Sequence, residues 1–225
     1  MSTRITSEAV DDYLKIIFAL TRKGGYAATG EIASRLELAP ASVTGMVQRL
    51  AVQDPPLVEY SKNRGAVLTD DGRRRALEVI RHHRLLETFL HETLGISWEK
   101  VHEEAEKLEH YISEDLEDRI AEHLGNPEVD PHGSPIPHKD GTIPEVRRVC
   151  ILDLPVGTEA TLSRVPSDDP ELLTYLEGHG LVPGAPVTLE SVEPFGGPVY
   201  LRTSGRRFGL GPEVARRLLV RPESS

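Results

Sequence analysis

The stretch that decides the fold is His102-Glu103-Glu104-Ala105-Glu106-Lys107-Leu108-Glu109-His110, within a longer segment of about residues 98–123. This segment contains neither glycine nor proline, and helix-forming residues dominate it, so the sequence predicts one continuous helix. At 100° per residue, two imidazoles and two carboxylates would share one helical face. These four residues are His102, Glu106, Glu109 and His110.

Carboxylates gathered this closely repel one another, and a bound cation is the simplest relief. The alternative is an ordinary solvent-exposed acidic face. Upstream, His83 and Glu87 are four residues apart and share a face of another helix. Eight of the nine histidines lie between residues 82 and 138. Because mixed histidine and carboxylate ligands suit divalent first-row metals, we predict metal binding as the central chemistry.

The composition is that of a soluble globular protein, with 38% hydrophobic and 28% charged residues among 225. This length favours more than one domain. No apolar run approaches a membrane span, and the first residues lack the apolar core of a signal peptide. Cys150 is the only cysteine, which excludes an internal disulfide. We therefore expect a cytoplasmic location.

The net charge of −10 is unevenly distributed along the chain. Residues 1–75 carry 11 Lys+Arg against 9 Asp+Glu, whereas residues 76–140 carry 6 against 16. The whole-chain charge thus describes an acidic middle segment. A DNA-binding domain at the amino end is not excluded.

The first 53 residues predict three helices. The first, at about 8–23, would carry Asp11 and Asp12 in its first turn, where the helix dipole favours anions. Residues 28–53 predict a helix, a tight turn and a second helix opened by Pro40, with Thr29 as the cap of the earlier helix. Small and hydroxylated residues near the start of the second helix would let that end enter a major groove.

Residues 57–68 predict a β-hairpin whose tip, Lys62-Asn63-Arg64-Gly65, carries two positive charges. A helix-turn-helix followed by a basic hairpin is a winged helix-turn-helix. The alternative is a pair of helices with an incidental hairpin. The predicted DNA-contacting residues are Thr29, Ala39, Pro40, Ala41, Ser42, Thr44, Gln48, Arg49, Lys62 and Arg64.

The rest of the chain predicts a helix at about 73–94, a Pro/Gly-rich loop at 126–138 and short strands beyond residue 150. The apolar face of residues 85–94 suggests self-association. The strands, at 160–165, 187–192, 199–203 and 218–220, predict a small β-barrel with a short helix at 170–177. The fold class is therefore mainly α with a small β part, and the predicted domains are 1–72, 73–140 and 145–225.

Several motifs follow one another in a distinctive order: Pro40-Ala-Ser-Val-Thr44, the hairpin tip, His82-His-Arg-Leu-Leu-Glu87, Val101–His110 and Pro131-His-Gly-Ser-Pro-Ile-Pro137. This order resembles the diphtheria-toxin-repressor family of metal-dependent transcriptional regulators. The last third, through 152–157 and Gly180-Leu-Val-Pro-Gly184, is similar to the FeoA-like small Src-homology-like β-barrel that ends many members. The resemblance covers nearly the whole chain.

The resemblance implies two metal sites per protomer. The primary site would use Asp12, Glu106, Glu109 and His110. Iron-type members have methionine and cysteine in place of Asp12 and Glu106, whereas manganese-type members have acids at both positions. The second site would use His83, Glu87 and His102, with Asp130, His132 and a barrel carboxylate such as Asp168.

Hard oxygen ligands with one or two imidazoles suit Mn²⁺, so we predict manganese, with Fe²⁺ as the alternative. Asp12 would belong to the DNA-binding head and the other primary ligands to the core of a homodimer. A shared metal would then fix the two recognition helices about one DNA turn apart, ~34 Å, to fit an inverted-repeat operator. The predicted protein is a manganese-responsive repressor of metal-uptake genes, not an enzyme.

Two rival functions stay open at this point. In a metalloenzyme, Glu106 or Glu109 would act as a general base beside the metal, but the sequence has no H-E-x-x-H motif and no glycine-rich phosphate loop. In a winged-helix regulator that answers to an organic ligand, the histidine and glutamate cluster would be structural. Metal titration followed by operator binding separates the three functions.

Overall fold

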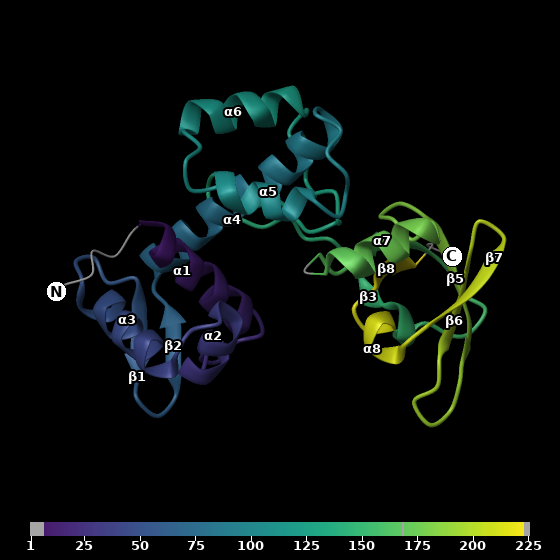
Figure 1. Ribbon diagram of the computed structural model, residues 1–225, viewed down its shortest axis with the longest axis horizontal. Coiled ribbons are helices and arrows are strands. Elements are labelled where there is room, and N and C mark those ends of the chain that lie inside the picture. Colours follow the sequence, from purple (N-terminus) through teal and green to yellow (C-terminus); the bar gives the residue numbers. More distant parts are fainter. Residues whose placement is uncertain (1–6, 168, 223–225) are drawn as a thin grey trace. The chain divides into compact units, whose positions relative to one another are not determined.

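The computed structural model describes residues 7–167 and 169–222 (Figure 1). The chain forms two compact units that are not consecutive in sequence. Of the described residues, the first unit contains 7–83, 109–112 and 137–142, and the second contains 84–108, 113–136, 143–167 and 169–222. The domain boundaries at residues 72 and 140 stay a prediction. None of the described helices has the length and apolar character needed to cross a membrane.

The first unit is a winged helix-turn-helix. Helices α2 and α3 pack against each other, and α1 packs against α2 and β2 (Figure 1). Strands β1 and β2 pair antiparallel, from Val58 opposite Leu68 to Ser61 opposite Gly65. Its elements are α1 (Ser7–Thr21), α2 (Thr29–Leu36), α3 (Pro40–Val52), β1 (Val58–Ser61), β2 (Gly65–Leu68) and the first half of α4 (Asp70–Glu92).

The turn at the tip of the wing requires a glycine where β2 begins. Gly65 has a φ of 106°, and a Cβ there would lie 2.1 Å from the carbonyl oxygen of Ala27. This close approach allows Ala27 to pair with Ala66 beside the hairpin. The prediction that Thr29 caps α2 is wrong, because Ala28 stands at the N-cap and its N–H donates to the Glu31 carboxylate at 3.2 Å.

The prediction of one helix over 98–123 is also wrong. Two helices occupy this segment, α5 (Val101–Leu108) and α6 (Glu114–His123), with a turn between them. Ser113 caps α6 by accepting a hydrogen bond from the Leu116 N–H, and three acidic side chains follow in the first turn. The turn, residues 109–112, belongs to the first unit, so its tertiary contacts outweigh the helical propensity of the sequence.

The leucines of α4 differ from expectation as well. Leu85, Leu86 and Leu90 are all buried within the single chain. These three leucines therefore do not need a second protomer to leave water, whereas Leu94, at the end of the same predicted face, is 59% exposed. Leu108 and Leu116 are exposed as well, so the uncovered apolar surface expected for self-association includes Leu94, Leu108 and Leu116.

The carboxyl-terminal part is a six-stranded antiparallel sheet in the order β3-β8-β4-β5-β6-β7. Its core also takes in α7, α8 and Trp98, which precedes α5. The sequence missed β3, β7 and α8. The elements are β3 (Val149–Cys150), a 3₁₀ turn (Ile151–Asp153), β4 (Glu159–Arg164), α7 (Pro170–Gly178), β5 (Pro186–Val192), β6 (Val199–Thr203), β7 (Arg206–Leu210), α8 (Pro212–Ala215) and β8 (Leu219–Pro222).

Candidate metal centre and DNA-binding surface

Three predicted ligands, Asp12, Glu109 and His110, come together in the first unit. Asp12 is on α1, and the other two lie in the turn that follows α5. One ligand atom from each lies within 4.8 Å of the others. His110 Nε2 is 3.3 Å from Glu109 Oε1 and 3.6 Å from Asp12 Oδ1. The Asp12 side chain is 45% exposed and that of Glu109 is fully buried, so the group is accessible from the Asp12 side.

The Glu109 carboxylate has a partner on each oxygen. Lys15 Nζ lies 2.5 Å from Oε1, and His83 Nδ1 lies 2.5 Å from Oε2. Burial acts to raise the pKa of Glu109, but the hydrogen bond and charge of His83, together with Lys15, outweigh it and hold the pKa below its usual range. Glu109 is therefore an ionised, buried carboxylate at neutral pH, which is the form that binds a cation.

Asp11 is a residue that the sequence analysis missed. It is buried, accepts a hydrogen bond from Arg75 Nε at 2.6 Å, and places Oδ2 3.5 Å from His110 Nδ1. The other ring nitrogen, Nε2, faces Asp12 and Glu109. In metal-binding histidines the second ring nitrogen usually donates to a carboxylate; here His110 Nδ1 faces Asp11 but makes no hydrogen bond among the described residues.

The dipole explanation for the two adjacent aspartates is weakened by the structure. Helix α1 already includes Ser7, so its acidic first-turn residue is Glu8, and Asp11 and Asp12 lie in the second turn. The dipole effect falls off within the first turn. The helix dipole therefore does not explain the positions of Asp11 and Asp12. Each carboxylate instead lies close to one ring nitrogen of His110.

The group fits a divalent cation. Oxygen and nitrogen ligands lie about 2.0–2.6 Å from divalent ions, so two ligands of one ion are at most about 5 Å apart. The separation of the three ligand atoms satisfies this limit. Two carboxylates and one imidazole are the hard ligands that Mn²⁺ and Fe²⁺ both accept, with no sulfur among them.

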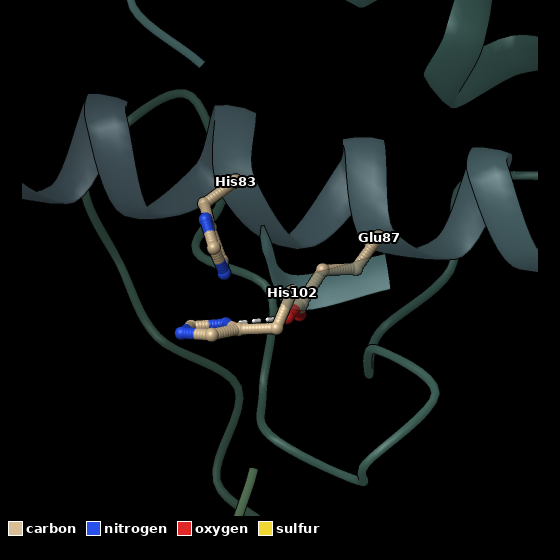
Figure 2. Close-up of side chains that lie close together, drawn as sticks. All are labelled: His83, Glu87 and His102. Atoms are coloured by element: carbon tan, nitrogen blue, oxygen red, sulfur yellow. Dashed lines mark hydrogen bonds and ion pairs between the residues drawn. The ribbon is translucent and has the colours of Figure 1, made fainter. Parts of the chain in front are cut away.

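A second cluster lies in the second unit around Glu87, which is 2% exposed. His102 Nδ1 is hydrogen-bonded to Glu87 Oε1 at 3.0 Å (dashed line in Figure 2). Figure 2 also shows His83, one turn earlier than Glu87 on α4. Asp130 and His132, from the loop after α6, each offer a ligand atom within 4.8 Å of one on Glu87. The site thus collects carboxylates and imidazoles from three segments.

The buried groups of this cluster favour an added positive charge. Burial and the nearby Glu87 raise the pKa of Asp130, against the effect of Arg84. Burial would lower the pKa of His132, but Glu87 and Asp130 outweigh it and raise the pKa. His132 Nδ1 is buried with no hydrogen-bond partner among the described residues, and Glu87 Oε1 lies 3.8 Å away. This fits a nitrogen that is free to bind a metal.

Asp130 also has a structural task. Its Oδ1 accepts hydrogen bonds from the backbone N–H groups of His132 and Ser134, at 2.9 and 2.8 Å. The same loop is held against the barrel, because the Val165 N–H donates to the His132 carbonyl at 3.0 Å. The His132 ring stacks on Trp98 at 5.3 Å between centroids. The second cluster is therefore built into the barrel end of the second unit.

Two predicted ligands are not placed with the groups that the sequence assigned them to. Glu106 lies on α5 with a side chain that is 54% exposed, and its carboxylate is 3.7 Å from His102 Nε2. Asp168 falls outside the described residues. The predicted shared face of His102, Glu106, Glu109 and His110 is wrong, because α5 ends at Leu108.

The predicted DNA-contacting residues of the helix-turn-helix lie at the start of α2 (Thr29), at the start of α3 (Ala39 to Thr44) and toward the end of α3 (Gln48 and Arg49). Thr29 and Thr44 are half-buried and the others are exposed, but the Thr44 hydroxyl donates to the Pro40 carbonyl at 2.9 Å. The buried face of α3 consists of Val43, Met46, Val47 and Leu50, as the sequence predicts. The exposed set comprises Ala39, Pro40, Ala41, Ser42, Gln48 and Arg49.

The wing tip presents its two cations to solvent. Lys62 and Arg64 are both exposed, and the Arg64 guanidinium lies 4.5 Å from the centre of the Tyr26 ring. This stacking orients the arginine without neutralising it. The wing therefore offers two positive charges for phosphate contacts.

Comparison with known proteins identifies each part of the chain. Residues 5–66 match "Iron dependent repressor, N-terminal DNA binding domain", residues 69–138 match "Iron dependent repressor, metal binding and dimerisation domain", and residues 149–222 match "FeoA domain". The iron-dependent repressor IdeR of Mycobacterium leprae (strain TN) is 33% identical over 225 residues, which covers 95% of this chain and 96% of that protein.

The chain belongs to the iron-dependent-repressor, or diphtheria-toxin-repressor, family. Another member, the HTH-type transcriptional regulator MntR of Bacillus subtilis (strain 168), is 38% identical over 118 residues, 52% of this chain and 81% of that protein. A solved "manganese-dependent transcriptional repressor complex with manganese" has a TM-score of 0.86 at 34% identity and covers 95% of this chain and 99% of that one.

Membership establishes the general function. The protein is a metal-dependent, DNA-binding transcriptional repressor with a dimerisation domain, and it is not an enzyme. The rival functions of metalloenzyme and organic-ligand sensor are thereby excluded. The relatives include both iron-dependent and manganese-dependent repressors, so the family alone does not choose the metal.

Proposed function

We propose that this protein is a manganese-responsive repressor of metal-uptake genes that acts in the cytoplasm, where the operator DNA is. The observation that carries the proposal is the group formed by Asp12, Glu109 and His110, whose ligand atoms lie within 4.8 Å of one another. We include Glu106 as a fourth ligand of this primary site. The proposal for Glu106 rests on the family resemblance, since its carboxylate lies 3.7 Å from His102 Nε2 in this structure.

The choice of manganese rests on the ligand atoms. Positions 12 and 106 carry carboxylates and no sulfur. Mn²⁺ binds nitrogen and oxygen ligands more weakly than the other first-row divalent ions and is best served by carboxylates. Fe²⁺ remains the alternative metal, because it accepts the same ligands.

The proposed switch depends on where the ligands lie in the chain. Asp12 belongs to the helix that supports the helix-turn-helix, whereas Glu109 and His110 form the turn that joins α5 to α6. A divalent ion at this group would supply the charge that lets the carboxylates stay close together. Held in this way, α1 and the turn have one fixed arrangement, and a DNA-competent arrangement that is rare without metal becomes the main one.

We propose a second metal site formed by His83, Glu87 and His102, with contributions from Asp130 and His132. The buried Nδ1 of His132 supports it, because this nitrogen makes no hydrogen bond to any described residue and lies 3.8 Å from Glu87 Oε1. Because the same loop is bonded to the barrel, occupation of this site would stiffen the second unit. Asp168 is the proposed barrel ligand of the same site.

The test compares the two metals directly. Metal-free protein is titrated anaerobically with buffered Mn²⁺ and with buffered Fe²⁺, and binding to operator DNA is followed by fluorescence anisotropy. We expect Mn²⁺ to activate DNA binding at the same free concentration that half-saturates the protein. Activation by Fe²⁺ alone would assign the protein to the iron-responsive branch and would overturn the manganese proposal.

A further inference from the structure

Lys15 occupies a position that the metal site itself would use. It lies on α1 three residues after Asp12, so both side chains leave the same side of the helix. Its Nζ is 2.5 Å from Glu109 Oε1, the same oxygen that lies 3.3 Å from His110 Nε2. The ammonium group therefore sits on the carboxylate oxygen that faces the other ligand atoms.

The second carboxylate oxygen of Glu109, Oε2, is not available to the metal ion in place of Oε1. His83 Nδ1 lies 2.5 Å from Oε2, so both oxygens are already partnered. A cation shared by Asp12, Glu109 and His110 has to take Oε1, and it meets Lys15 there. Two positive charges on one oxygen repel each other strongly in a buried setting.

The Lys15 ammonium group is able to move away from the Glu109 carboxylate. Its side chain is 20% exposed, whereas that of Glu109 is fully buried. A lysine carries its charge on a flexible four-carbon stem, so the ammonium group can turn to water while the stem stays packed. Glu109 has no such freedom and needs a positive partner in either state.

We propose that Lys15 is a built-in competitor of the metal ion. It neutralises Glu109 when no metal is bound, and it must be displaced from Oε1 before Glu109 can join Asp12 and His110 as a ligand. Lys15 thereby raises the metal concentration at which the repressor becomes active. This inference rests on the proposed function in one respect, namely that Glu109 is a ligand.

The expected change in Mn²⁺ affinity follows from the partial burial of the Lys15–Glu109 ion pair. Exposed ion pairs are worth little and buried ones much more, and a pair with one partly exposed member falls between them. We expect removal of Lys15 to tighten Mn²⁺ binding roughly tenfold, which corresponds to about 1.4 kcal/mol. If Lys15 served only to stabilise a buried carboxylate, its removal would leave metal affinity unchanged or lower it.

The experiment measures Mn²⁺ binding to the full-length, metal-free protein by electron paramagnetic resonance of free Mn²⁺. The variants are Lys15→Gln and Lys15→Met, the second of which keeps the apolar stem, and both are checked for folding by circular dichroism. Lys107→Gln is the matched control, because Lys107 also pairs with glutamates but on the exposed side of α5. Lys15→Arg, which keeps the charge, should bind Mn²⁺ no more tightly than wild type.

We expect Lys15→Gln and Lys15→Met to bind Mn²⁺ about tenfold more tightly and Lys107→Gln to match wild type. A folded Lys15 variant with unchanged or weaker Mn²⁺ affinity would overturn this inference alone. Failure of the proposed function looks different: wild type and Glu109→Gln would then bind Mn²⁺ equally, whatever the Lys15 variants do.

Discussion

Replacing Glu109 by glutamine keeps the size of the side chain and removes its charge. In the metal-free protein this charge is the partner of Lys15 and of His83, both at 2.5 Å, and the side chain is fully buried. Removing one member of a buried pair costs about 3–5 kcal/mol when the other stays buried. Lys15 can turn toward water, so we expect Glu109→Gln to lower the free energy of unfolding by about 2 kcal/mol.

The stability difference between wild type and Glu109→Gln should also depend on pH, in a direction that follows from the pKa of Glu109. The pKa of Glu109 is held below its usual range, so the folded state binds this proton more weakly than the unfolded state does. The stabilisation by the Glu109 carboxylate is therefore fully present above the ordinary pKa of a glutamate, about 4.3, and is lost as the pH falls through the folded value. The difference between wild type and Glu109→Gln should be large at pH 7 and should shrink below about pH 4.

The assay is urea denaturation of metal-free protein at several pH values, repeated with Mn²⁺ at pH 7. Glu104→Gln is the control, because Glu104 pairs with Lys107 on an exposed surface and should change stability by less than about 0.5 kcal/mol. Glu109→Gln should also lose most of the stabilisation that Mn²⁺ gives wild type. A Glu109→Gln protein that matches wild type in metal-free stability and in its response to Mn²⁺ would refute the reasoning.

Three further predictions concern other parts of the chain. Glu106→Cys should shift the activating metal from Mn²⁺ toward Fe²⁺ or Zn²⁺, because a thiolate is a softer ligand than a carboxylate, and an unchanged ranking of metals in the DNA-binding assay would remove position 106 from the site. Lys62→Ala or Arg64→Ala should weaken binding to all DNA sequences alike and reduce the salt dependence by about one counterion for each phosphate contact, whereas altered operator preference at constant salt slope would show base reading. Gly133→Ala should lower the free energy of unfolding by several kcal/mol, against about 1–2 kcal/mol for Gly125→Ala. Both glycines have positive φ, but of the two only Gly133 would bring a Cβ against a carbonyl oxygen, that of Ser163 at 1.9 Å. Equal losses of stability in denaturation experiments would contradict the close approach of the loop to β4.

The sequence predicted those parts of the fold that local signals determine. Pro40 marks the start of α3, and the helical spacing of Val43, Met46, Val47 and Leu50 marks its buried face. The hairpin with the basic tip was equally visible, because turn residues separate two apolar runs. The missed strand β7 begins with two arginines, whose exposed side chains hide its strand character.

The site itself depended on contacts that no local pattern contains. Residues 102–110 have the propensity of one helix, but α5 ends at Leu108, and the signal for the break, Ser113 as a cap before an acidic turn, lies after it. Lys15 and Glu109 are 94 residues apart in sequence, and only tertiary packing brings them together. Asp11 could not be distinguished from a helix-dipole partner until its contacts with Arg75 and His110 were visible.

The central claim is that the repressor is active only when α1 and the turn at 109–112 share a metal. The most direct measurement is the affinity of wild type and Asp12→Ala for a DNA duplex selected from a random library by the Mn²⁺-loaded protein. We expect wild type to bind the duplex with Mn²⁺ and to release it with a chelator, and Asp12→Ala to retain measurable Mn²⁺ binding yet fail to bind the duplex at saturating Mn²⁺. Full-affinity, sequence-specific binding by the metal-free protein, or normal binding by Asp12→Ala, would contradict the account.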